Sequence, residues 1–388
     1  MRIAHTLRVF DAEKVLAMRI PLSRPMIGKE EKEAVLRVLE SGHLAQGREV
    51  ECFEKEFAAY TGTQEAVATS SGTTALFVAL KALGVQPGDK VVTTPFTFVA
   101  TASAILHCGG IPVFCDVDHK TGNIDPERLQ EVVARDPQVK GVVIVHLYGT
   151  PCALSEILAV VRSRGLFLVE DCAQAHGAEY WGKKVGSFGD VGIFSFYPTK
   201  NMTTGEGGMV VTNLPEVAER CRMLINHGSR KRYYHEILGY NFRMTDIAAA
   251  IGRVQLRRLD EQNAKRRENA LFYSERLAGL RGIEIPEVPQ GTLPVFHQYT
   301  VRVLERRDAL LAFLRERGIG CEVYYPLPLH RQAFLESYGY GSFPVAERLS
   351  REVLSIPVHP GLSRSDLEEV VSLIREFFEG PGFVGDGA

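Results

Sequence analysis

The sequence contains no long apolar run. No uninterrupted apolar stretch reaches the ~18 residues that a membrane span needs, and the N-terminus lacks the apolar segment of a secretory signal. The seven cysteines are odd in number, scattered and never spaced C-x-x-C, which argues against a disulfide framework and a zinc knuckle. The histidines show no H-x-x-x-H or H-E-x-x-H pair, so no metal site is expected. These absences favour a cytoplasmic protein without a membrane partner.

The chain also lacks an excess of charge of either sign. Its 388 residues carry 45 basic and 47 acidic side chains, a net charge of -2. Dedicated nucleic-acid and membrane-surface proteins usually show a strong basic bias, so neither kind of partner is expected. Hydrophobic residues at 45% and charged residues at 24% are ordinary for a folded chain, which excludes wholesale disorder. At roughly 100–200 residues per domain, the length indicates two domains, or one large domain with an appendage.

Short apolar runs alternate with amphipathic helical stretches between about residues 62 and 212. Runs such as GVVIV and LFLVE are continuously apolar, as expected of parallel strands covered on both faces. The alternation predicts a layered α/β sheet whose ligands bind at the carboxyl ends of strands. The expected strands are Ala66–Thr69, Lys90–Thr93, Pro112–Asp116, Gly141–His146, Leu166–Glu170, Val191–Phe196 and Met209–Thr212, with helices such as Thr73–Leu83 and Leu154–Arg162 between them.

A long helical pattern follows, from Thr245 to about Leu280, and a proline-rich stretch then leads into a smaller α+β domain. That domain is expected to hold strands at Gln298–Val303 and Cys321–Tyr325, and helices at Asp308–Arg317, Val345–Leu354 and Ser363–Phe378. We therefore expect an N-terminal extension at residues 1–17, a large domain at 18–260 and a small C-terminal domain at 261–388. Met18 is an alternative start.

Two segments that follow expected strands carry groups suited to chemistry. Ser70–Thr74 places small and hydroxyl residues at a helix start, whose backbone N–H groups favour phosphate; a capped helix start without a ligand is the alternative. Asp171 stands at the exit of a buried strand, where a carboxylate needs a cation or hydrogen-bond donors. The alternative for Asp171 is a helix N-cap.

A third segment places Lys200 in a turn between two apolar strands, among aromatics, hydroxyls and glycines. Most lysines are solvated surface groups. However, Ser195 lies five residues earlier and can face the same anion site, and a lysine in a site of low polarity becomes a nucleophile. A fourth segment, Gly239–Asp246, opens the long helix, with Thr245 or Asp246 as its N-cap and Asn241 as a further candidate.

Together these features match the needs of pyridoxal 5'-phosphate. Its aldehyde needs a lysine, its phosphate needs a helix start with hydroxyls, its ring nitrogen needs a carboxylate and its ring face needs an apolar partner such as Phe98.

The sequence resembles the DegT group of sugar-nucleotide aminotransferases, within the aspartate-aminotransferase fold (fold type I), from about Ile20 to Phe378. The matching motifs are S-G-T-T-A-L (71–76), T-P-F-T-F-V-A-T (94–101), V-E-D-C-A-Q-A-H-G (169–177), F-S-F-Y-P-T-K-N (194–201), G-E-G-G (205–208), N-H-G (226–228) and G-Y-N-F-R-M-T-D (239–246). The resemblance implies an α/β fold with a mixed, mostly parallel seven-stranded sheet, helices on both faces and a smaller α+β C-terminal domain.

The resemblance also implies site residues. Lys200 would hold the cofactor covalently, Asp171 would pair with the pyridine nitrogen, Gln174 would contact the phenolic oxygen and Phe98 would stack on the ring. The implied phosphate contacts are Gly72, Thr73, Ser195 and Asn241, the last from the partner subunit of a homodimer with shared active sites. Cys172 stands where many members carry alanine, and we expect no loss of activity from it.

The implied reaction moves an amino group from L-glutamate to a nucleotide-linked keto-sugar by a ping-pong mechanism. Candidate contacts to the sugar nucleotide are Arg230, Lys231, Arg232, Tyr325 and His330. The alternatives are a cofactor-binding regulatory protein of the same fold without turnover, a sugar dehydratase, whose relatives carry histidine at the lysine position, and a nicotinamide enzyme, for which no G-x-G-x-x-G follows the first strand. The sugar, the choice between uridine and thymidine diphosphate, the position aminated and the pathway, polysaccharide or antibiotic, stay open.

Overall fold

Seven strands form one mixed sheet in the computed structural model, which describes residues 18–380. They are β1 (Glu65–Thr69), β2 (Lys90–Thr93), β3 (Ile111–Phe114), β4 (Val139–Val145), β5 (Phe167–Asp171), β8 (Val191–Ser195) and β9 (Gly208–Thr212). Their spatial order is β1-β9-β8-β5-β4-β2-β3. All seven strands expected from the sequence are confirmed, whereas the extension expected at residues 1–17 lies outside the described residues.

The sheet is mostly parallel. Strands β3, β2, β4, β5 and β8 run parallel to one another, and β9 is antiparallel to its two neighbours, β8 and β1. Because β5 and β8 are parallel neighbours, their carboxyl ends meet at one edge of the sheet. Asp171, the last residue of β5, and the turn that follows β8 therefore lie at the same edge.

Successive residues of the strands pack into two different cores. Val142 and Ile144 of β4 lie in a core with α3 (Arg48–Thr61), α6 (Pro126–Arg135) and α7 (Leu154–Ser163). Val143 lies in a core on the other face, with α4 (Gly72–Ala82), α5 (Ala100–His107) and α8 (Pro215–Ile225). Burial on both faces explains why the strand sequences are continuously apolar.

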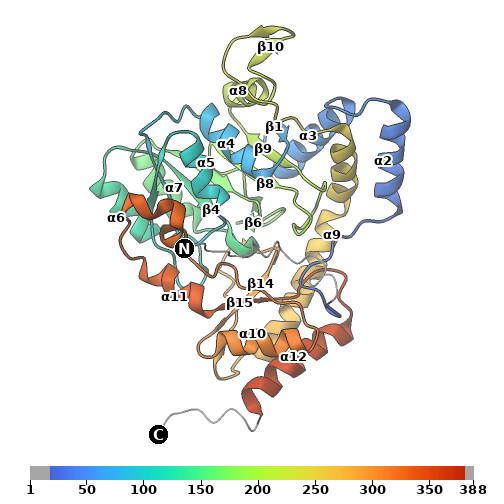
Figure 1. Cartoon of the computed structure of the whole chain (residues 1–388), viewed down its shortest axis with the longest axis vertical. Helices are drawn as coiled ribbons and strands as arrows, with labels where there is room; N and C mark the ends of the chain where they lie inside the picture. The colour runs from blue at the N-terminus through green and yellow to red at the C-terminus, as the bar shows by residue number, and fades with distance from the viewer. Residues whose placement is uncertain (1–17, 381–388) are drawn as a thin grey trace, which may run out of the picture.

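The long helix α9 (Asp246–Leu277) connects two cores. Its first half packs into the core of α3, and its last turns pack into the core of the C-terminal elements. Figure 1 shows α9 running from the level of the large sheet down to α10 and α12. Thr245 is its N-cap, since its hydroxyl accepts the N–H of Ala248. The expected boundary between residues 260 and 261 falls inside this helix, and the domain ranges remain a prediction.

The C-terminal part consists of a three-stranded antiparallel sheet and three helices. The sheet has the order β12 (Ile283–Glu284), β14 (Tyr299–Val303) and β15 (Val353–Ile356). The helices are α10 (Arg307–Glu316), α11 (Pro344–Glu352) and α12 (Arg364–Glu379). The three expected helices and the strand before α10 are thus confirmed.

The strand expected at Cys321–Tyr325 is wrong, and a strand occurs instead at β15. Of residues 321–325, only Glu322 pairs, in an isolated bridge with Ser355. The carbonyl of Cys321 accepts hydrogen bonds from the Arg315 guanidinium and not from the backbone of a neighbouring strand. Residues 353–356 are buried on both faces, so their apolar run reads equally well as the tail of the preceding helix.

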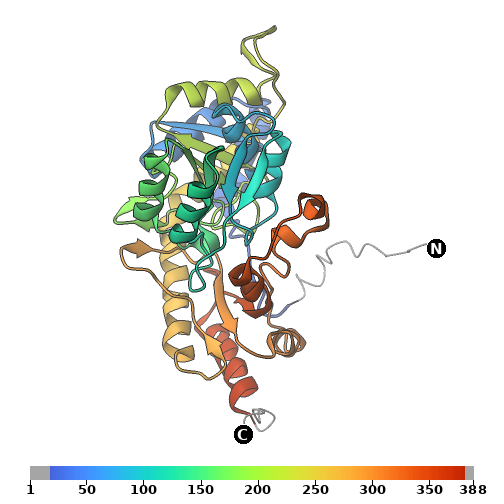
Figure 2. The ribbon, with the colours of Figure 1, turned by 90° about the vertical axis from the view of Figure 1, so that its left-hand side faces the viewer.

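The remaining elements are short or peripheral. They are α2 (Lys29–Ser41), which packs on α9, β6 (Glu179–Tyr180), β7 (Lys183–Lys184), β10 (Ser229–Lys231), β11 (Tyr234–His235), β13 (Thr292–Leu293), and the 3-10 helices η1 (Leu147–Gly149), η2 (Leu329–Arg331) and η3 (Ala333–Tyr338). The β10–β11 hairpin projects from the end of the molecule that carries α8 (Figures 1 and 2). Between residues 18 and 380, no helix has both the length and the hydropathy to cross a membrane.

Candidate active site

Lys200 lies in the turn that follows β8, and local hydrogen bonds define that turn. Its backbone N–H donates to the carbonyl of Tyr197 at 2.9 Å. The carbonyl of Phe196 accepts the hydroxyl of Thr203 at 2.8 Å and the N–H of Thr204 at 3.1 Å. Desolvation lowers the pKa of the Lys200 amine to about 8, although the charge of Asp171 opposes this shift. The amine is therefore substantially neutral at mildly alkaline pH and available as a nucleophile or base.

Asp171 is buried at the end of β5 with an incomplete set of partners. One carboxylate oxygen accepts the N–H of Ala173 at 3.0 Å, and the other accepts the hydroxyl of Thr101 at 3.1 Å. Burial raises the pKa of Asp171, and the N–H of Ala173, the charge of Lys200 and the Thr101 hydroxyl only partly offset this rise. A buried carboxylate in this state gains most from a further cationic partner.

Gly72 and Ser195 meet where α4 begins. Ser71 caps this helix, because its hydroxyl accepts the N–H of Thr74 at 3.2 Å. A Cβ atom at Gly72 would lie 2.6 Å from the Cβ of Ser195, so only glycine allows this approach. The N–H groups of Gly72 and Thr73 have no acceptor inside the helix and share this corner with the Ser195 hydroxyl. The corner is therefore suited to a phosphate.

Gln174, Tyr325 and Phe98 form a second group near Asp171. The side-chain oxygen of Gln174 accepts the N–H of Tyr148 at 2.7 Å, and its amide donates to the Tyr325 hydroxyl at 3.1 Å. The centroids of the Phe98 and Tyr325 rings are 6.4 Å apart. Phe98 is 55% exposed, although Tyr325 beside it is partly buried. Its ring is therefore available to cover a flat ligand.

Three predicted substrate residues lie elsewhere. Arg230, Lys231 and Arg232 are exposed on the projecting β10–β11 hairpin (Figure 2). Arg230 forms ion pairs with Glu219 at 2.7 Å and Glu236 at 2.9 Å. Within this chain the hairpin does not join the group around Lys200, so these residues can reach such a site only on another molecule.

Asn241 and His330 differ in exposure. Asn241 is exposed and pairs through its backbone with Asn226, next to Phe242, whose carbonyl accepts the N–H of Ser70 at 2.8 Å. His330 is buried, and its Nε2 lies 2.9 Å from the Glu347 carboxylate. The His330 ring packs edge-on against Phe343. A direct contact between His330 and a substrate remains a prediction that this geometry does not favour.

Two functional residues escaped the sequence reasoning. Thr101 supplies a donor to Asp171, and Tyr148 orients Gln174 through its backbone N–H. Thr101 is the last residue of the motif at 94–101, so the motif marks it as a candidate. However, no sequence spacing links a hydroxyl at residue 101 to a carboxylate at residue 171. Tyr148 carries no sequence signal, because its backbone N–H and not its side chain contacts Gln174. Its backbone has a left-handed conformation (φ 58°).

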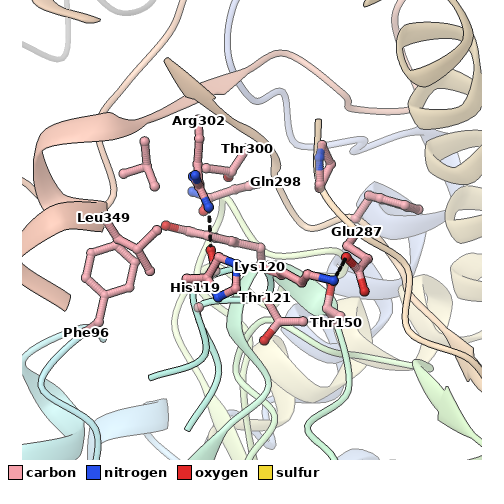
Figure 3. Close-up of a pocket in the computed structure, with 15 residues that line it drawn as sticks. Phe96, His119, Lys120, Thr121, Thr150, Glu287, Gln298, Thr300, Arg302 and Leu349 are labelled. Atoms are coloured by element: carbon pink, nitrogen blue, oxygen red, sulfur yellow. Dashed lines mark hydrogen bonds and ion pairs between the residues drawn. The ribbon is translucent and has the colours of Figure 1, made fainter. Parts of the chain in front are cut away.

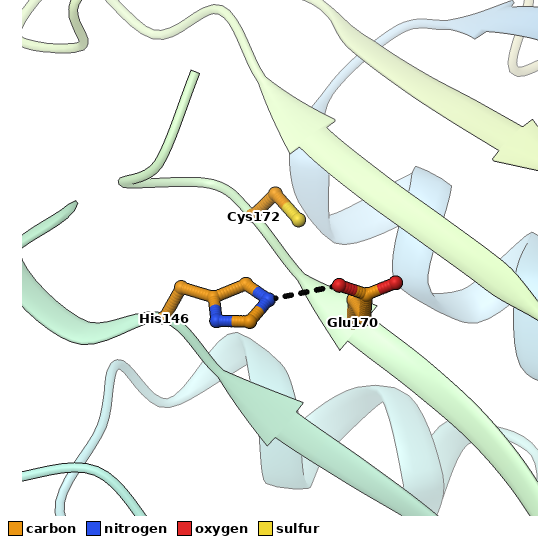
Figure 4. Close-up of side chains that lie close together, drawn as sticks. All are labelled: His146, Glu170 and Cys172. Carbon is orange, nitrogen blue, oxygen red and sulfur yellow. Dashed lines mark hydrogen bonds and ion pairs between the residues drawn. The ribbon is translucent and has the colours of Figure 1, made fainter. Parts of the chain in front are cut away.

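A buried trio, His146, Glu170 and Cys172, has the donor types of a metal site (Figure 4). Glu170 already accepts three backbone N–H groups, from residues 186, 188 and 189, at 2.7–2.8 Å. Nδ1 of His146 accepts the N–H of Cys152 at 3.0 Å, so Nε2 carries the hydrogen that faces Glu170 at 3.1 Å. Neither group has a free lone pair for an ion, and the trio is explained as a buried structural pair.

A small cavity, bordered in part by Tyr148, lies between the loop after β3 and the C-terminal part (Figure 3). It is bordered by Gln298 and Arg302, and Arg302 donates to the carbonyl of His119 at 2.9 Å. Lys120 and Glu287 form an ion pair at 3.0 Å at its other side. At about 30 Å³ it has room for water and not for a cofactor.

Comparisons with known proteins agree on one family. The model of the DegT/DnrJ/EryC1/StrS aminotransferase family matches residues 25–375. The pleiotropic regulatory protein of Geobacillus stearothermophilus is 42% identical over 356 residues, which cover 89% of this chain and 95% of that protein. The dTDP-3-amino-3,4,6-trideoxy-alpha-D-glucose transaminase of Streptomyces venezuelae is 42% identical over 353 residues, which cover 90% of this chain and 92% of that protein.

A solved structure shares the architecture as well. DesV of S. venezuelae superposes with a TM-score of 0.88 at 42% identity, covering 90% of this chain and 94% of that one. This similarity confirms the fold class that the sequence predicts.

Proposed function

The chain belongs to the DegT/DnrJ/EryC1/StrS aminotransferase family, and we propose that it moves an amino group from L-glutamate to a nucleotide-linked keto-sugar, with pyridoxal 5'-phosphate as cofactor. The observation that carries the proposal is the electrostatic coupling of the Lys200 amine, with a pKa of about 8, to the buried Asp171 carboxylate. The resemblance to a sugar-nucleotide transaminase over 90% of the chain supports the substrate class.

The residues present fit the cofactor. A pyridinium nitrogen supplies the cation that the buried Asp171 carboxylate lacks. The corner of Gly72, Thr73 and Ser195 suits its phosphate, and the exposed face of Phe98 suits its ring. When bound, pyridoxal phosphate supplies an electron sink that stabilises charge left on the donor carbon.

The residues of the chain then have separate tasks. Asp171 holds a proton on the ring nitrogen through direct charge pairing. Lys200 would hold the cofactor covalently, and its Nζ would be the base that accepts the proton of the donor carbon and the acid that returns it. A pKa of about 8 suits both directions of that transfer. Gln174, whose side chain is held by Tyr148 and Tyr325, would contact the phenolic oxygen of the cofactor.

The sugar nucleotide needs cationic partners for its diphosphate. We assign this role to Arg230, Lys231 and Arg232 of the projecting hairpin of a second copy, with Tyr325 and His330 as further candidates on the Lys200 side. The exposure of Asn241 and of the hairpin supports a homodimer with shared sites. Mixing Lys200→Ala with Asn241→Ala tests this, because one site of each hybrid dimer would carry neither defect. Hybrid dimers that form without recovering activity would contradict shared sites.

One alternative is favoured by a specific observation: a relative at 42% identity is named a pleiotropic regulatory protein. A regulator without turnover would still bind the cofactor. A panel of keto-sugar nucleotides with glutamate as donor, read by product mass and NMR, separates the two functions. Amino-sugar product supports the transaminase, and bound cofactor without product on any panel member supports the regulator.

Lys200 is tested directly by borohydride reduction of the protein loaded with pyridoxal phosphate. We expect one covalent adduct, at Lys200, and none in Lys200→Ala, which should fold and lose amino transfer at least about 10⁴-fold. An adduct at another lysine would refute the assignment.

A further inference from the structure

A cluster of buried polar side chains lies next to the Lys200 turn. Asn201, Asn263 and His297 are 3%, 1% and 8% exposed. They come from three separate segments: the Lys200 turn, the middle of α9 and the chain that enters β14. Burial of polar groups is costly unless every group is hydrogen-bonded, so such a cluster demands a reason.

Asn201, the residue after Lys200, uses its whole side-chain amide in this cluster. Its Nδ2 donates to Oδ1 of Asn263 at 2.8 Å and to the carbonyl of Val295 at 3.1 Å. Its Oδ1 lies 3.2 Å from Nδ1 of His297, and because an amide oxygen only accepts, that nitrogen carries the hydrogen. Asn263 in turn donates to the carbonyl of His176 at 2.7 Å. Asn201 is thereby fixed from three directions.

Burial, helped by the surrounding positive charges, keeps the histidines of this region neutral. Burial lowers the pKa of His176 to about 3 and the pKa of His297 well below its ordinary value, and the charges of Lys200 and Arg266 lower both further. Arg266, one turn beyond Asn263 on α9, donates to the carbonyls of Phe296 and His297 at 3.3 and 3.2 Å. The segment that bonds Asn201 is therefore itself fixed to α9, and the only carboxylate coupled to the Lys200 amine among the described residues is Asp171.

We propose that Asn201 is a positioning residue, and that the amide clamp of Asn201, Asn263 and His297 holds the main chain beside Lys200 so that its amine stays desolvated and directed at Asp171. A lysine side chain has four flexible carbons, so its direction is set by how firmly its own backbone is held. The clamp supplies that restraint from α9 and from the entry to β14, two elements outside the Lys200 turn. Its purpose rests on the proposed function, but its effect on the Lys200 amine exists without any cofactor.

The test measures the pKa of the Lys200 amine in cofactor-free protein, by competitive labelling with acetic anhydride across pH and mass spectrometry of the Lys200 peptide. Wild type should titrate near pH 8. In Asn201→Ala and in Asn263→Ala, water reaches the loosened turn, so the midpoint should rise by about half a unit or more toward the value of a solvated lysine.

Asn269→Ala is the matched control. Asn269 lies on the same helix, is 2% exposed and donates to two backbone carbonyls, those of Val358 and His359 at 3.4 and 3.1 Å, but it takes no part in the clamp. The Asn269→Ala variant should lose about as much stability as the two clamp variants without changing the titration midpoint of the Lys200 amine.

The proposal is refuted if the titration midpoint of Lys200 is unchanged in Asn201→Ala and Asn263→Ala, or if it rises equally in Asn269→Ala. Asn263→Ala decides alone if Asn201→Ala does not fold, because it removes a partner of Asn201 and leaves the residues of the Lys200 turn unchanged. Failure of the proposed function is a separate result: wild type would then titrate near pH 8 yet form no borohydride-stable adduct with pyridoxal phosphate.

Discussion

Glu170 and Asp171 are adjacent carboxylates at the end of β5, yet their surroundings on the two faces of the sheet are opposite. Glu170 accepts three backbone N–H groups and faces the Nε2 hydrogen of His146. Burial alone would raise its pKa, but His146 and these N–H groups outweigh burial and hold the pKa below its ordinary value. Asp171 has two donors, and its pKa remains raised.

The difference separates a structural carboxylate from a functional one. A carboxylate whose acceptor sites are filled by the protein has nothing left to offer a ligand. A carboxylate that is buried and only half satisfied carries a cost that a bound cation can remove. Burial and residue type do not distinguish these neighbours, but a count of their donors does.

The largest difference is expected between Asp171→Asn and Glu170→Gln, which make the same chemical change, carboxylate to amide, one residue apart. Asp171→Asn should fold and lose amino transfer by about 10²–10³-fold, because a neutral amide no longer stabilises charge on the cofactor ring. Steady-state kinetics of the loaded protein at equal cofactor occupancy measures this loss. A comparable loss of turnover per loaded molecule in Glu170→Gln would contradict the assignment of the two roles.

Glu170→Gln should act on folding. Replacing the carboxylate leaves the amide NH₂ against backbone donors, so we expect a loss of about 3–5 kcal/mol in the free energy of unfolding. Because the folded pKa of Glu170 is lowered, its contribution is present above about pH 4.3, its ordinary value, and is lost as pH falls through the folded value. Denaturant titrations at several pH values should therefore show the gap to wild type narrowing below pH 4. A gap independent of pH would contradict the ionised state of Glu170.

The sequence predicts the strands of the large sheet but not which of the two carboxylates is functional. The apolar strands and their order along the chain follow from composition, because a strand buried on both faces must be continuously apolar. The motif residues Lys200 and Asp171 meet at one sheet edge because β5 and β8 are parallel neighbours, and strand order is not written in any local pattern. The adjacent positions 170 and 171 do not indicate which carboxylate is satisfied, since most donors to the two are distant in sequence: residues 146, 186, 188 and 189 for Glu170 and residue 101 for Asp171.

The wrong strand at residues 321–325 and the unfavourable placement of His330 have the same origin. The apolar run at residues 353–356 forms β15 because β14 lies beside it, and propensity alone reads it as the end of a helix. His330 lies in a segment that resembles the family's substrate-binding region, but its ring contacts Glu347 and Phe343, which lie 17 and 13 residues further along the chain. Partners distant in sequence decide both cases.

A third prediction sharpens the comparison through pH. In cofactor-free protein, the rate at which pyridoxal phosphate attaches to Lys200 should rise with pH, with its midpoint near pH 8, the pKa of the amine, and level off above that pH. Since the charge of Asp171 raises that pKa, Asp171→Asn should move the midpoint to lower pH, whereas Glu170→Gln should leave it in place. Stopped-flow absorbance across pH 6–10 gives the midpoints. A shift to higher pH in Asp171→Asn would mean that Asp171 does not carry the charge assigned to it.

The smallest expected effect comes from Thr101→Val, which keeps the shape of the side chain and removes one of the two donors to Asp171. The pKa of Asp171 should rise further, because the Thr101 hydroxyl favours its ionised form. A hydrogen bond to a charged group contributes about 1.5–3 kcal/mol, so cofactor affinity should fall roughly tenfold near pH 7 and less at higher pH, where the carboxylate ionises anyway.

Thr97→Val is the control for that experiment. Thr97 is equally buried and lies 3.3 Å from the Thr101 hydroxyl, but it does not reach Asp171. Equilibrium titration of pyridoxal phosphate, followed by absorbance at pH 7 and 8.5, should show the pH-dependent loss for Thr101→Val alone. Equal losses in both variants would mean that the hydroxyl pair matters through packing, and that Asp171 is no less satisfied than Glu170.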